Sequence, residues 1–371
     1  MKKAIVSVIN DLSTDQRVHK ACLALQKSGY EVLLVGRELK LSAPLLPRSY
    51  NCKRMRLIFS KGPFFYIEFN IRLLLFLLFK RTNLLLSNDL DTLLPNYLVS
   101  KVRNKPLLFD SHEYFTQTPE LIDRHVVQWI WKRIERFVVP RLDQMITVNE
   151  SIAHLFRQEY KLQVHVVRNI PPRFAPQSEI TRKELGLPEG KKLLIFQGAG
   201  INMHRGAEEM VEAMTLLPEC VLLFLGDGDV VAFLKQKVQN LGLADRVLFL
   251  SKMPYLAMMQ YTRLADIGLS LDKDTNLNYR FSLPNKLFDY IHAGIPVLAS
   301  PLPEIKKILD TYQTGLCIVN HEPAEIARTA MTMLGDEKRM AEWKTQCLAA
   351  AESLCWENEE KILLEIYAKF N

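Results

Sequence analysis

The chain has 371 residues, of which 48% are hydrophobic and 24% are charged, and its formal net charge is +7. This length leaves room for two domains, and the composition is that of a soluble globular protein. Basic residues are in excess in the first 170 residues, and the remainder is mildly acidic. The sequence has no nucleic-acid-binding motif, which excludes a nucleic acid as the expected partner. The basic part therefore predicts an anionic substrate or a membrane surface.

The cysteines and the first residues of the chain predict a cytoplasmic location. No signal peptide is expected, because Met1 leads through two lysines directly into AIVSVIN, which is too short for an apolar signal region. The six cysteines form no C-x-x-C pair, so we expect reduced thiols; they are Cys22, Cys52, Cys220, Cys317, Cys347 and Cys355.

The first half of the sequence predicts strands that alternate with helices. A strand at 3–10 precedes a helix that Ser13 and Gln16 are expected to open as a capping box and Gly29 to close. Further apolar runs that end at polar residues are typical of strands; they span 31–36, 84–89, 106–111, 144–149 and 164–169.

Residues 64–81, FFYIEFNIRLLLFLLFKR, form the most apolar stretch of the chain. Glu68 and Arg72 interrupt it, and the unbroken part, 73–79, is far shorter than the roughly 20 residues that cross a bilayer. A buried helix is the favoured interpretation. An amphipathic helix on a membrane surface, next to Lys80 and Arg81, stays open as the alternative.

The second half alternates strands and helices more regularly, which predicts a parallel sheet covered on both faces. Its expected strands are 192–200, 220–229, 246–251, 266–271, 295–300 and 316–320. The Pro-rich passage 169–178 separates the two halves. The predicted fold is therefore α/β, with doubly wound parallel-sheet domains at 1–170 and 171–355. Ligands of such sheets bind at the carboxyl ends of strands, so the cleft between the domains is the expected site.

Two junctions between strand and helix in the second domain indicate an anion site. In FQGAGINMHRG, Gly198 and Gly200 allow close approach of a ligand, and Arg205 supplies donors for a phosphate at a helix start. In SLPNKLFDY, Lys286 stands at a helix start, where positive charge is unfavourable unless an anion shares the position. Ser282 and Asn285 flank that lysine.

Three further groups of polar residues follow predicted strands. Gly226 and Asp227 form a glycine turn that a nucleotide-sugar could pass. His112 and Glu113 follow the strand 106–111, where a histidine can exchange a proton near neutral pH. Asp-x-Asp occurs at 89–91 and 227–229, but this short pattern is common, so we expect no metal site.

With these motifs in view, the chain resembles the GT-B-fold glycosyltransferases of family four, the glycosyl transferases group 1, over nearly its whole length. The segment NDLSTDQRVHKACLALQKSGYEVLLVG is similar to the opening strand, loop and helix of that family, and FDSHE is similar to a segment found in some members. The most specific block is NKLFDYIHAGIPVLASPLPEI. The resemblance implies that Asn10, Asp15 and Arg17 lie on the acceptor side and that residues 356–371 pack back on the first domain.

The resemblance also implies roles for residues that match the family's motifs. Arg205 stands where a lysine contacts the donor diphosphate, and Asp289 matches the second glutamate of a pair that binds sugar or ribose hydroxyls. Glu304 closes the block, and His112 matches a histidine that assists catalysis. The first glutamate of the pair is replaced by Phe281, and a usual arginine by Gly200. We expect Lys286 to supply the charge of that missing arginine.

The expected function is transfer of a sugar from a nucleotide-sugar donor to a glycan or lipid-linked acceptor, in cell-surface polysaccharide or glycolipid synthesis. Retention of configuration is implied by the resemblance alone, and no metal or other cofactor is expected. The catalytic residues would be His112, Glu113 and Asp289. Association with the inner face of the membrane is an open expectation. Two alternatives remain: a nucleotide-sugar 2-epimerase of the same fold, and a degenerate nucleotide-sugar-binding subunit, which the loss at Phe281 motivates.

Overall fold

The computed structural model describes residues 1–13, 15–39, 42, 44–173 and 180–370. The chain divides into two compact units, which are residues 1–169 with 358–371 (unit 1) and residues 170–357 (unit 2). The predicted linker, 169–178, lies partly outside the described residues. Each unit has its own parallel sheet and its own core.

Unit 1 contains a seven-stranded parallel sheet within its described residues, in the order β3-β2-β1-β4-β5-β6-β7. Its central strands are almost wholly buried, because helices cover both faces. The strands are β1 (Lys2–Asp11), β2 (Tyr30–Glu38), β3 (Asn51–Arg56), β4 (Leu84–Asn88), β5 (Leu107–Ser111), β6 (Gln144–Thr147) and β7 (Gln163–Val166). The carboxyl ends of β4 and β5 lie side by side, with Asn88 next to Asp110.

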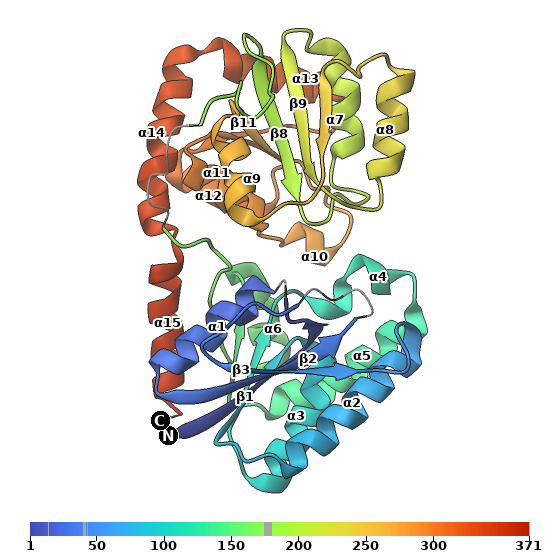
Figure 1. Cartoon of the computed structure of the whole chain (residues 1–371), viewed down its shortest axis with the longest axis vertical. Helices are drawn as coiled ribbons and strands as arrows, with labels where there is room; N and C mark the ends of the chain where they lie inside the picture. Colours follow the sequence, from blue (N-terminus) through green and yellow to red (C-terminus); the bar gives the residue numbers. More distant parts are fainter. Residues whose placement is uncertain (14, 40–41, 43, 174–179, 371) are drawn as a thin grey trace. The chain divides into compact units, whose positions relative to one another are not determined.

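The helices of unit 1 lie on two faces of this sheet. Right-handed crossovers place α1 on one face, because the chain steps from β1 to β2, and place α2, α3 and α5 on the other, because it then steps back toward β7. Figure 1 shows α2, α3 and α5 gathered on one side of the sheet. The helices are α1 (Gln16–Lys27), α2 (Gly62–Phe79), α3 (Leu90–Arg103), α4 (Pro119–Ile122), α5 (His125–Val138), α6 (Glu150–Tyr160) and the chain-terminal α15 (Trp356–Ala368), with a short 3-10 helix η1 (Phe115–Gln117). An ion pair from Lys27 to Glu360 joins α1 to α15.

Unit 2 contains a six-stranded parallel sheet within its described residues, in the order β10-β9-β8-β11-β12-β13. Its strands are β8 (Lys192–Gly198), β9 (Cys220–Gly226), β10 (Val247–Leu250), β11 (Ile267–Ser270), β12 (Val297–Ala299) and β13 (Gly315–Cys317). Its helices are α7 (Ala207–Ala213), α8 (Val231–Asn240), α9 (Tyr255–Arg263), α10 (Leu277–Arg280), α11 (Asn285–Ala293), α12 (Pro303–Tyr312), α13 (Pro323–Gly335) and α14 (Glu337–Ser353), with η3 (Met214–Leu216).

Two apolar clusters hold the sheet of unit 2 from its two faces. One is formed by side chains such as Phe196, Met210 and Trp343, and the other by Ile195, Phe288 and Tyr290. Successive residues of β8 thus point into opposite clusters, as the pleat of a strand requires. The hydroxyl of Tyr290 donates to the carbonyl oxygens of Ile195 (3.3 Å) and Leu269 (3.1 Å) and so ties α11 to two central strands, β8 and β11.

Two local predictions for unit 1 are corrected by the structure. The helix predicted to open at Ser13 begins at Gln16, and its N-cap is Asp15, whose carboxylate accepts from the amide of Val18 at 3.0 Å. Asp is as good a cap as Ser, and only the side chain next to the first helical turn reaches its amides. The edge strand β3 was missed, because its sequence NCKRMR is basic and buries only Met55.

Helix α2 occupies the most apolar stretch of the chain and is only partly buried. Phe65, Phe69, Leu73 and Leu77 are buried on one side, and the opposite side is exposed. By length and composition alone, α2 is the one helix of the described residues that could cross a membrane, and 22% of it is buried. The favoured interpretation of a buried helix therefore describes only one of its faces.

Candidate functional site

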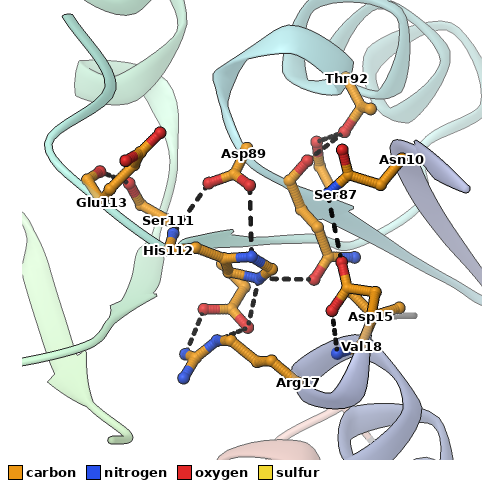
Figure 2. A network of polar contacts seen from close by, with 12 residues as sticks. Asn10, Asp15, Arg17, Val18, Ser87, Asp89, Thr92, Ser111, His112 and Glu113 are labelled. Carbon is orange, nitrogen blue, oxygen red and sulfur yellow. Dashed lines mark hydrogen bonds and ion pairs between the residues drawn. The ribbon is translucent and has the colours of Figure 1, made fainter. Parts of the chain in front are cut away.

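In unit 1, His112 lies at the carboxyl edge of the sheet between two carboxylates. It directly follows β5, and Asp89 directly follows the neighbouring strand β4. Nδ1 of His112 lies 3.2 Å from Oδ2 of Asp89, and the backbone amide of His112 donates to Oδ1 of Asp89 at 2.9 Å. Figure 2 shows the imidazole held in this position. Asp89 has a φ of +57°, unusual for a residue other than glycine, so this contact is made at a strained backbone position.

A second carboxylate, that of Asp110, faces the other edge of the imidazole. Oδ2 of Asp110 lies 3.5 Å from Nε2 of His112. The buried guanidinium of Arg17 binds Asp110 at both carboxylate oxygens, at 2.6 and 3.1 Å, and also donates to the carbonyl oxygen of Val167 at 2.7 Å. These bonds occupy Arg17 inside unit 1, so we assign it to positioning Asp110.

The two carboxylates keep His112 charged at neutral pH. Burial disfavours the imidazolium, but the negative charges of Asp89 and Asp110 outweigh it and raise the pKa of His112 to about 9. Burial likewise opposes the charged form of Asp110, but Arg17 and then His112 hold the pKa of that carboxyl well below its usual range. At neutral pH His112 is therefore a donor of hydrogen bonds and has no free ring nitrogen to accept a proton.

The other residues predicted in unit 1 lie near this centre without forming part of the ion pairs. Asp15 caps α1, and Asn10 donates to it at 3.4 Å. Figure 2 places the Glu113 carboxylate on the far side of Ser111 from the imidazole. The structure thus groups His112 with Asp89 and Asp110 and does not pair it with Glu113. Asp89 was weighed in the sequence only as half of an Asp-x-Asp pattern.

In unit 2, Arg205 and Lys286 meet on one buried carboxylate, that of Asp272. Nη1 of Arg205 lies 2.7 Å from Oδ1 of Asp272, and Nζ of Lys286 lies 3.1 Å from Oδ2. Asp272 follows β11 at the carboxyl edge of the sheet and is fully buried. The sequence prediction missed it, although its place one residue after the predicted strand 266–271 was the available signal.

Each of the two cations also lies close to an aromatic ring. The guanidinium of Arg205 lies 4.7 Å from the ring centre of Tyr279, and the ammonium of Lys286 lies 4.6 Å from that of Phe196. Burial lowers the pKa of Lys286, and the positive charge of Arg205 adds to this against the effect of Asp272. One carboxylate therefore compensates two neighbouring cations, which leaves the cluster with an excess positive charge.

Donor groups at the start of α11 point to an additional acceptor. Pro284 precedes the first turn of α11 without a side-chain cap, so no cap side chain accepts from the amides of that turn, and the amide of Leu287 donates to the carbonyl oxygen of Pro284 at 3.1 Å. Nε of Arg205 and Oγ of Ser282 are among the buried side-chain atoms of the described residues that have no hydrogen-bond partner, and so is Oδ2 of Asp272, which faces Lys286 as an ion pair. Asn285, the first residue of the helix, is exposed. A helix N-terminus with buried, unpaired donors and an excess of positive charge is suited to a phosphate.

The glycine turns differ in what their missing side chains allow. A Cβ at Gly226 would lie 1.9 Å from the carbonyl oxygen of Gly198, so packing of β9 against β8 requires that glycine. A Cβ at Gly198 would meet no atom closer than 3.8 Å, and one at Gly200 would lie 3.3 Å from Nδ2 of Asn202. A side chain at Gly198 would thus make only ordinary contacts, and one at Gly200 would press on the side chain of Asn202, so neither glycine is required in the way that Gly226 is. Asp227 is exposed and accepts from the amide of Gly228 at 2.9 Å.

Asp289 and Glu304 are both buried in unit 2. The carboxylate of Asp289 accepts from the hydroxyl of Tyr255 at 2.7 Å and from the side-chain Nε2 of Gln197 at 3.1 Å. Glu304 lies in the first turn of α12, where negative charge is favourable. Asp289 and Lys286 are three residues apart on α11 and are both buried, so one helix brings them to the same end of the sheet. Within the described ranges, no group of three or more His, Cys, Asp or Glu side chains has the arrangement of a metal site.

Two Rossmann-like units with parallel sheets define the class of GT-B-fold proteins, and the comparisons with known proteins agree. The structure superposes on sucrose-phosphate synthase from Thermosynechococcus elongatus with a TM-score of 0.84 at 16% identity, over 100% of this chain and 99% of that one. Anabaena HepE in complex with UDP-glucose gives a TM-score of 0.76 at 14% identity, over the whole of both chains. At these identities the likeness establishes the fold.

Two family models identify the family. The model for glycosyl transferases group 1 matches residues 177–347, and the model for glycosyltransferase family 4 matches residues 15–171. The chain belongs to this family of GT-B glycosyltransferases. The D-inositol 3-phosphate glycosyltransferase of Nocardia farcinica is 25% identical over 251 residues, which are 63% of this chain and 54% of the relative. The chain spans about half the length of the curated relatives that it matches.

Proposed function

We propose that this protein transfers a sugar from a nucleotide-sugar to a glycan or lipid-linked acceptor, with retention of configuration and without a metal ion. The observation that carries the proposal is the convergence of Arg205 and Lys286 on Asp272 beside the start of α11. A donor diphosphate supplies the negative charge that one carboxylate leaves short. The neighbour HepE, whose structure contains UDP-glucose, supports a nucleotide-sugar as the donor.

In this proposal, unit 2 lowers the barrier by stabilising the departing diphosphate. As the bond between sugar and phosphate breaks, negative charge grows on the phosphate oxygens. Arg205, Lys286 and the amides at the start of α11 are fixed in place before that charge develops, and fixed donors stabilise a transition state with little reorganisation. Retention of configuration is supported by the family alone.

Unit 1 contributes the acceptor side through His112. Because its pKa is raised to about 9, the imidazolium stabilises negative charge by donating hydrogen bonds and does not act as a general base at neutral pH. Asp89 and Asp110 orient it, and Arg17 holds Asp110. We assign Glu113 no step, since its carboxylate lies away from the ring (Figure 2).

Replacement of Lys286 by alanine tests the donor site. We expect the affinity for the donor nucleotide to fall tenfold or more, because a charge-assisted hydrogen bond contributes about 1.5–3 kcal/mol. Lys306→Ala is the matched control, since Lys306 is exposed on α12 and pairs with Asp310. Isothermal titration measures both, after a thermal-shift screen of UDP-, GDP-, ADP- and CMP-sugars selects the nucleotide. Equal affinities in the two variants would contradict the proposed site.

The two alternative functions differ from this proposal in a simple assay. An epimerase converts the nucleotide-sugar alone, whereas a transferase needs an acceptor or hydrolyses the donor slowly. A degenerate binding subunit binds the nucleotide-sugar but neither epimerises it nor transfers or hydrolyses its sugar. Turnover that is lost in His112→Ala excludes the degenerate subunit.

We further propose a cytoplasmic location at the inner face of the cell membrane, where nucleotide-sugars and lipid-linked acceptors meet, in cell-surface polysaccharide or glycolipid synthesis. The support is the charge of the first 170 residues and the exposed apolar face of α2.

A further inference from the structure

The exposed side of α2 is an unbroken apolar stripe. Five residues spaced three or four apart form it, and each is between 52% and 86% exposed. They are Phe64, Ile67, Ile71, Leu75 and Phe79. Residues at this spacing lie on one side of a helix, opposite the buried Phe65, Phe69, Leu73 and Leu77. A stripe of large apolar side chains in water is unusual for a monomeric protein and marks an interaction surface.

The carboxylate of Glu68, the one acidic residue of α2, is occupied by local hydrogen bonds and an ion pair. The Glu68 carboxylate accepts from the backbone amides of Ile58 and Phe59 at 2.9–3.0 Å, and it pairs with Arg72 at 2.8 Å. Ile58 is 80% exposed, and the ring of Phe59 lies 5.5 Å from that of Phe64. Glu68 thus fastens a loop that adds two more exposed apolar residues beside the stripe.

Helix α5 presents a second exposed face, in which apolar side chains alternate with arginines. Val126, Trp129, Ile130 and Phe137 are all exposed. The guanidinium of Arg133 lies 5.6 Å from the centre of the Trp129 ring, and that of Arg141, three residues after the end of the helix, lies 4.7 Å from the centre of the Phe137 ring. The only acid of the helix, Glu135, is buried. Trp and Arg side by side are typical of a surface that meets lipid headgroups.

The two helices are neighbours, and the ends of the stripe on α2 are basic. The ring of Tyr66 on α2 lies 5.3 Å from that of Trp131 on α5, edge to face. Lys61 precedes α2, and Lys80 and Arg81 follow it. We name the exposed residues of α2 and α5 together the α2/α5 face. The α2/α5 face combines apolar side chains with positive charge. Its one acidic residue outside the buried core, Glu68, is paired with Arg72.

The inner sides of the same helices hold the segments that carry His112. Nδ2 of Asn70 on α2 donates to the carbonyl oxygen of Asp91, two residues after Asp89, at 3.0 Å. On α5, Trp131 stacks edge to face on Phe115, and Glu135 accepts from Thr116 at 3.3 Å, so α5 fixes the loop that follows His112. The helices that carry the α2/α5 face therefore also contact the segments on both sides of His112.

We infer that the α2/α5 face docks on the surface of a bilayer that contains anionic lipids, with α2 lying in the interface. Charge complementarity selects this occupant, since basic residues surround the apolar stripe. A helix that spans the bilayer does not fit, because one side of α2 is packed in the core of unit 1. This inference rests on the proposed function and extends it: docking would bring the His112 site to a lipid-linked acceptor in the membrane.

Vesicle flotation with the full-length protein tests this inference. We expect binding to vesicles of phosphatidylcholine mixed with phosphatidylglycerol, and weak binding to phosphatidylcholine alone. Leu75→Glu should reduce binding at least roughly tenfold by placing a charge in the interface. Met331→Glu is the matched control, because Met331 on α13 of unit 2 is 50% exposed, close to the 52% of Leu75. Arg133→Glu should cost roughly tenfold or more on anionic vesicles, whereas Lys344→Glu on α14 should cost little.

Several results would overturn the inference. One is equal binding to neutral and anionic vesicles, and another is equal binding of Leu75→Glu and Met331→Glu. A lipid-free dimer that Leu75→Glu converts to a monomer would show that the face joins two copies of the chain. Circular dichroism and nucleotide titration of each variant verify its folding. Nucleotide binding depends on Arg205 and Lys286 in unit 2, so it reports on the proposed function separately from lipid binding.

Discussion

The two polar clusters of this protein differ in how their charges are balanced. In unit 1, the cations Arg17 and His112 face the carboxylates of Asp110 and Asp89, and each partner is satisfied within the cluster. In unit 2, Arg205 and Lys286 share Asp272 alone, and buried donors remain unpaired. The first cluster is complete in the protein itself. We propose that the second takes up an additional anion, so substitutions in unit 2 should change the affinity for an anionic ligand and substitutions in unit 1 should change the position of His112.

Removal of the imidazole gives the largest expected effect on activity. His112→Ala should lower the rate of sugar transfer about 10²- to 10³-fold, as loss of one fixed donor to developing charge does. The affinity for the donor nucleotide should stay unchanged, because its cations lie in unit 2. Steady-state kinetics and nucleotide titration measure the two quantities. His154→Ala, an exposed histidine on α6, is the control, and a His112→Ala enzyme with full activity would remove His112 from the mechanism.

Loss of the shared carboxylate tests the excess charge in unit 2. Asp272→Asn leaves the buried Lys286 and the partly buried Arg205 without their shared partner, so we expect the free energy of unfolding to fall by about 3–5 kcal/mol. Bound nucleotide should restore part of this loss, since the diphosphate replaces the missing negative charge.

Calorimetry with and without nucleotide measures the effect of Asp272→Asn. Asp274→Asn is the matched control, because Asp274 pairs with Arg280 at 3.0 Å on the surface, where an ion pair contributes about 0–1 kcal/mol. If nucleotide stabilised Asp272→Asn no more than the wild type, the diphosphate would not occupy the place next to Asp272.

The charge balance of unit 1 predicts a dependence of stability on pH. The pKa of His112 is raised from its usual 6.5 to about 9 in the folded protein. Its ion pairs therefore contribute fully below pH 6.5, and this contribution is lost as the pH rises through about 9; it is on the order of a few kcal/mol. The difference in unfolding free energy between the wild type and His112→Gln should be large at pH 6 and should shrink toward pH 10. A difference that does not vary with pH would mean that the pKa of His112 is the same in the folded and unfolded protein, and one that grows as the pH rises through 6.5 would mean that folding lowers this pKa.

The sequence predicted the parts of each site that follow a strand or open a helix. His112, Arg205 and Lys286 are such residues, and the rule that polar groups gather at the carboxyl ends of parallel strands finds them. The partners of these residues could not be found in this way. Asp89 and Asp272 reach His112 and Arg205 across neighbouring strands, and Asp110 meets Arg17 from the distant helix α1. These contacts depend on strand order and on packing, which the sequence alone did not give.

The exposed half of α2 and the strand β3 show a second reason why parts of the structure could not be predicted from the sequence. The pattern of an apolar run does not tell which side of a helix is covered, because that depends on the neighbouring helices. An edge strand with three basic residues out of six, such as NCKRMR, resembles a charged loop. Both features involve surfaces, where the hydrophobic pattern is weakest as a signal.

The smallest effect concerns the start of α1, where the predicted cap Ser13 and the observed cap Asp15 can be separated by substitution. Asp15→Ala removes the acceptor of the Val18 amide, so we expect a loss of about 1 kcal/mol in the stability of unit 1. Ser13→Ala should change stability by much less. Because Arg17 follows Asp15 in the first turn and holds Asp110, a frayed helix should also weaken the support of His112. Asp15→Ala should then lower the rate of transfer more than Ser13→Ala does, and equal rates would show that Arg17 keeps its place without the cap.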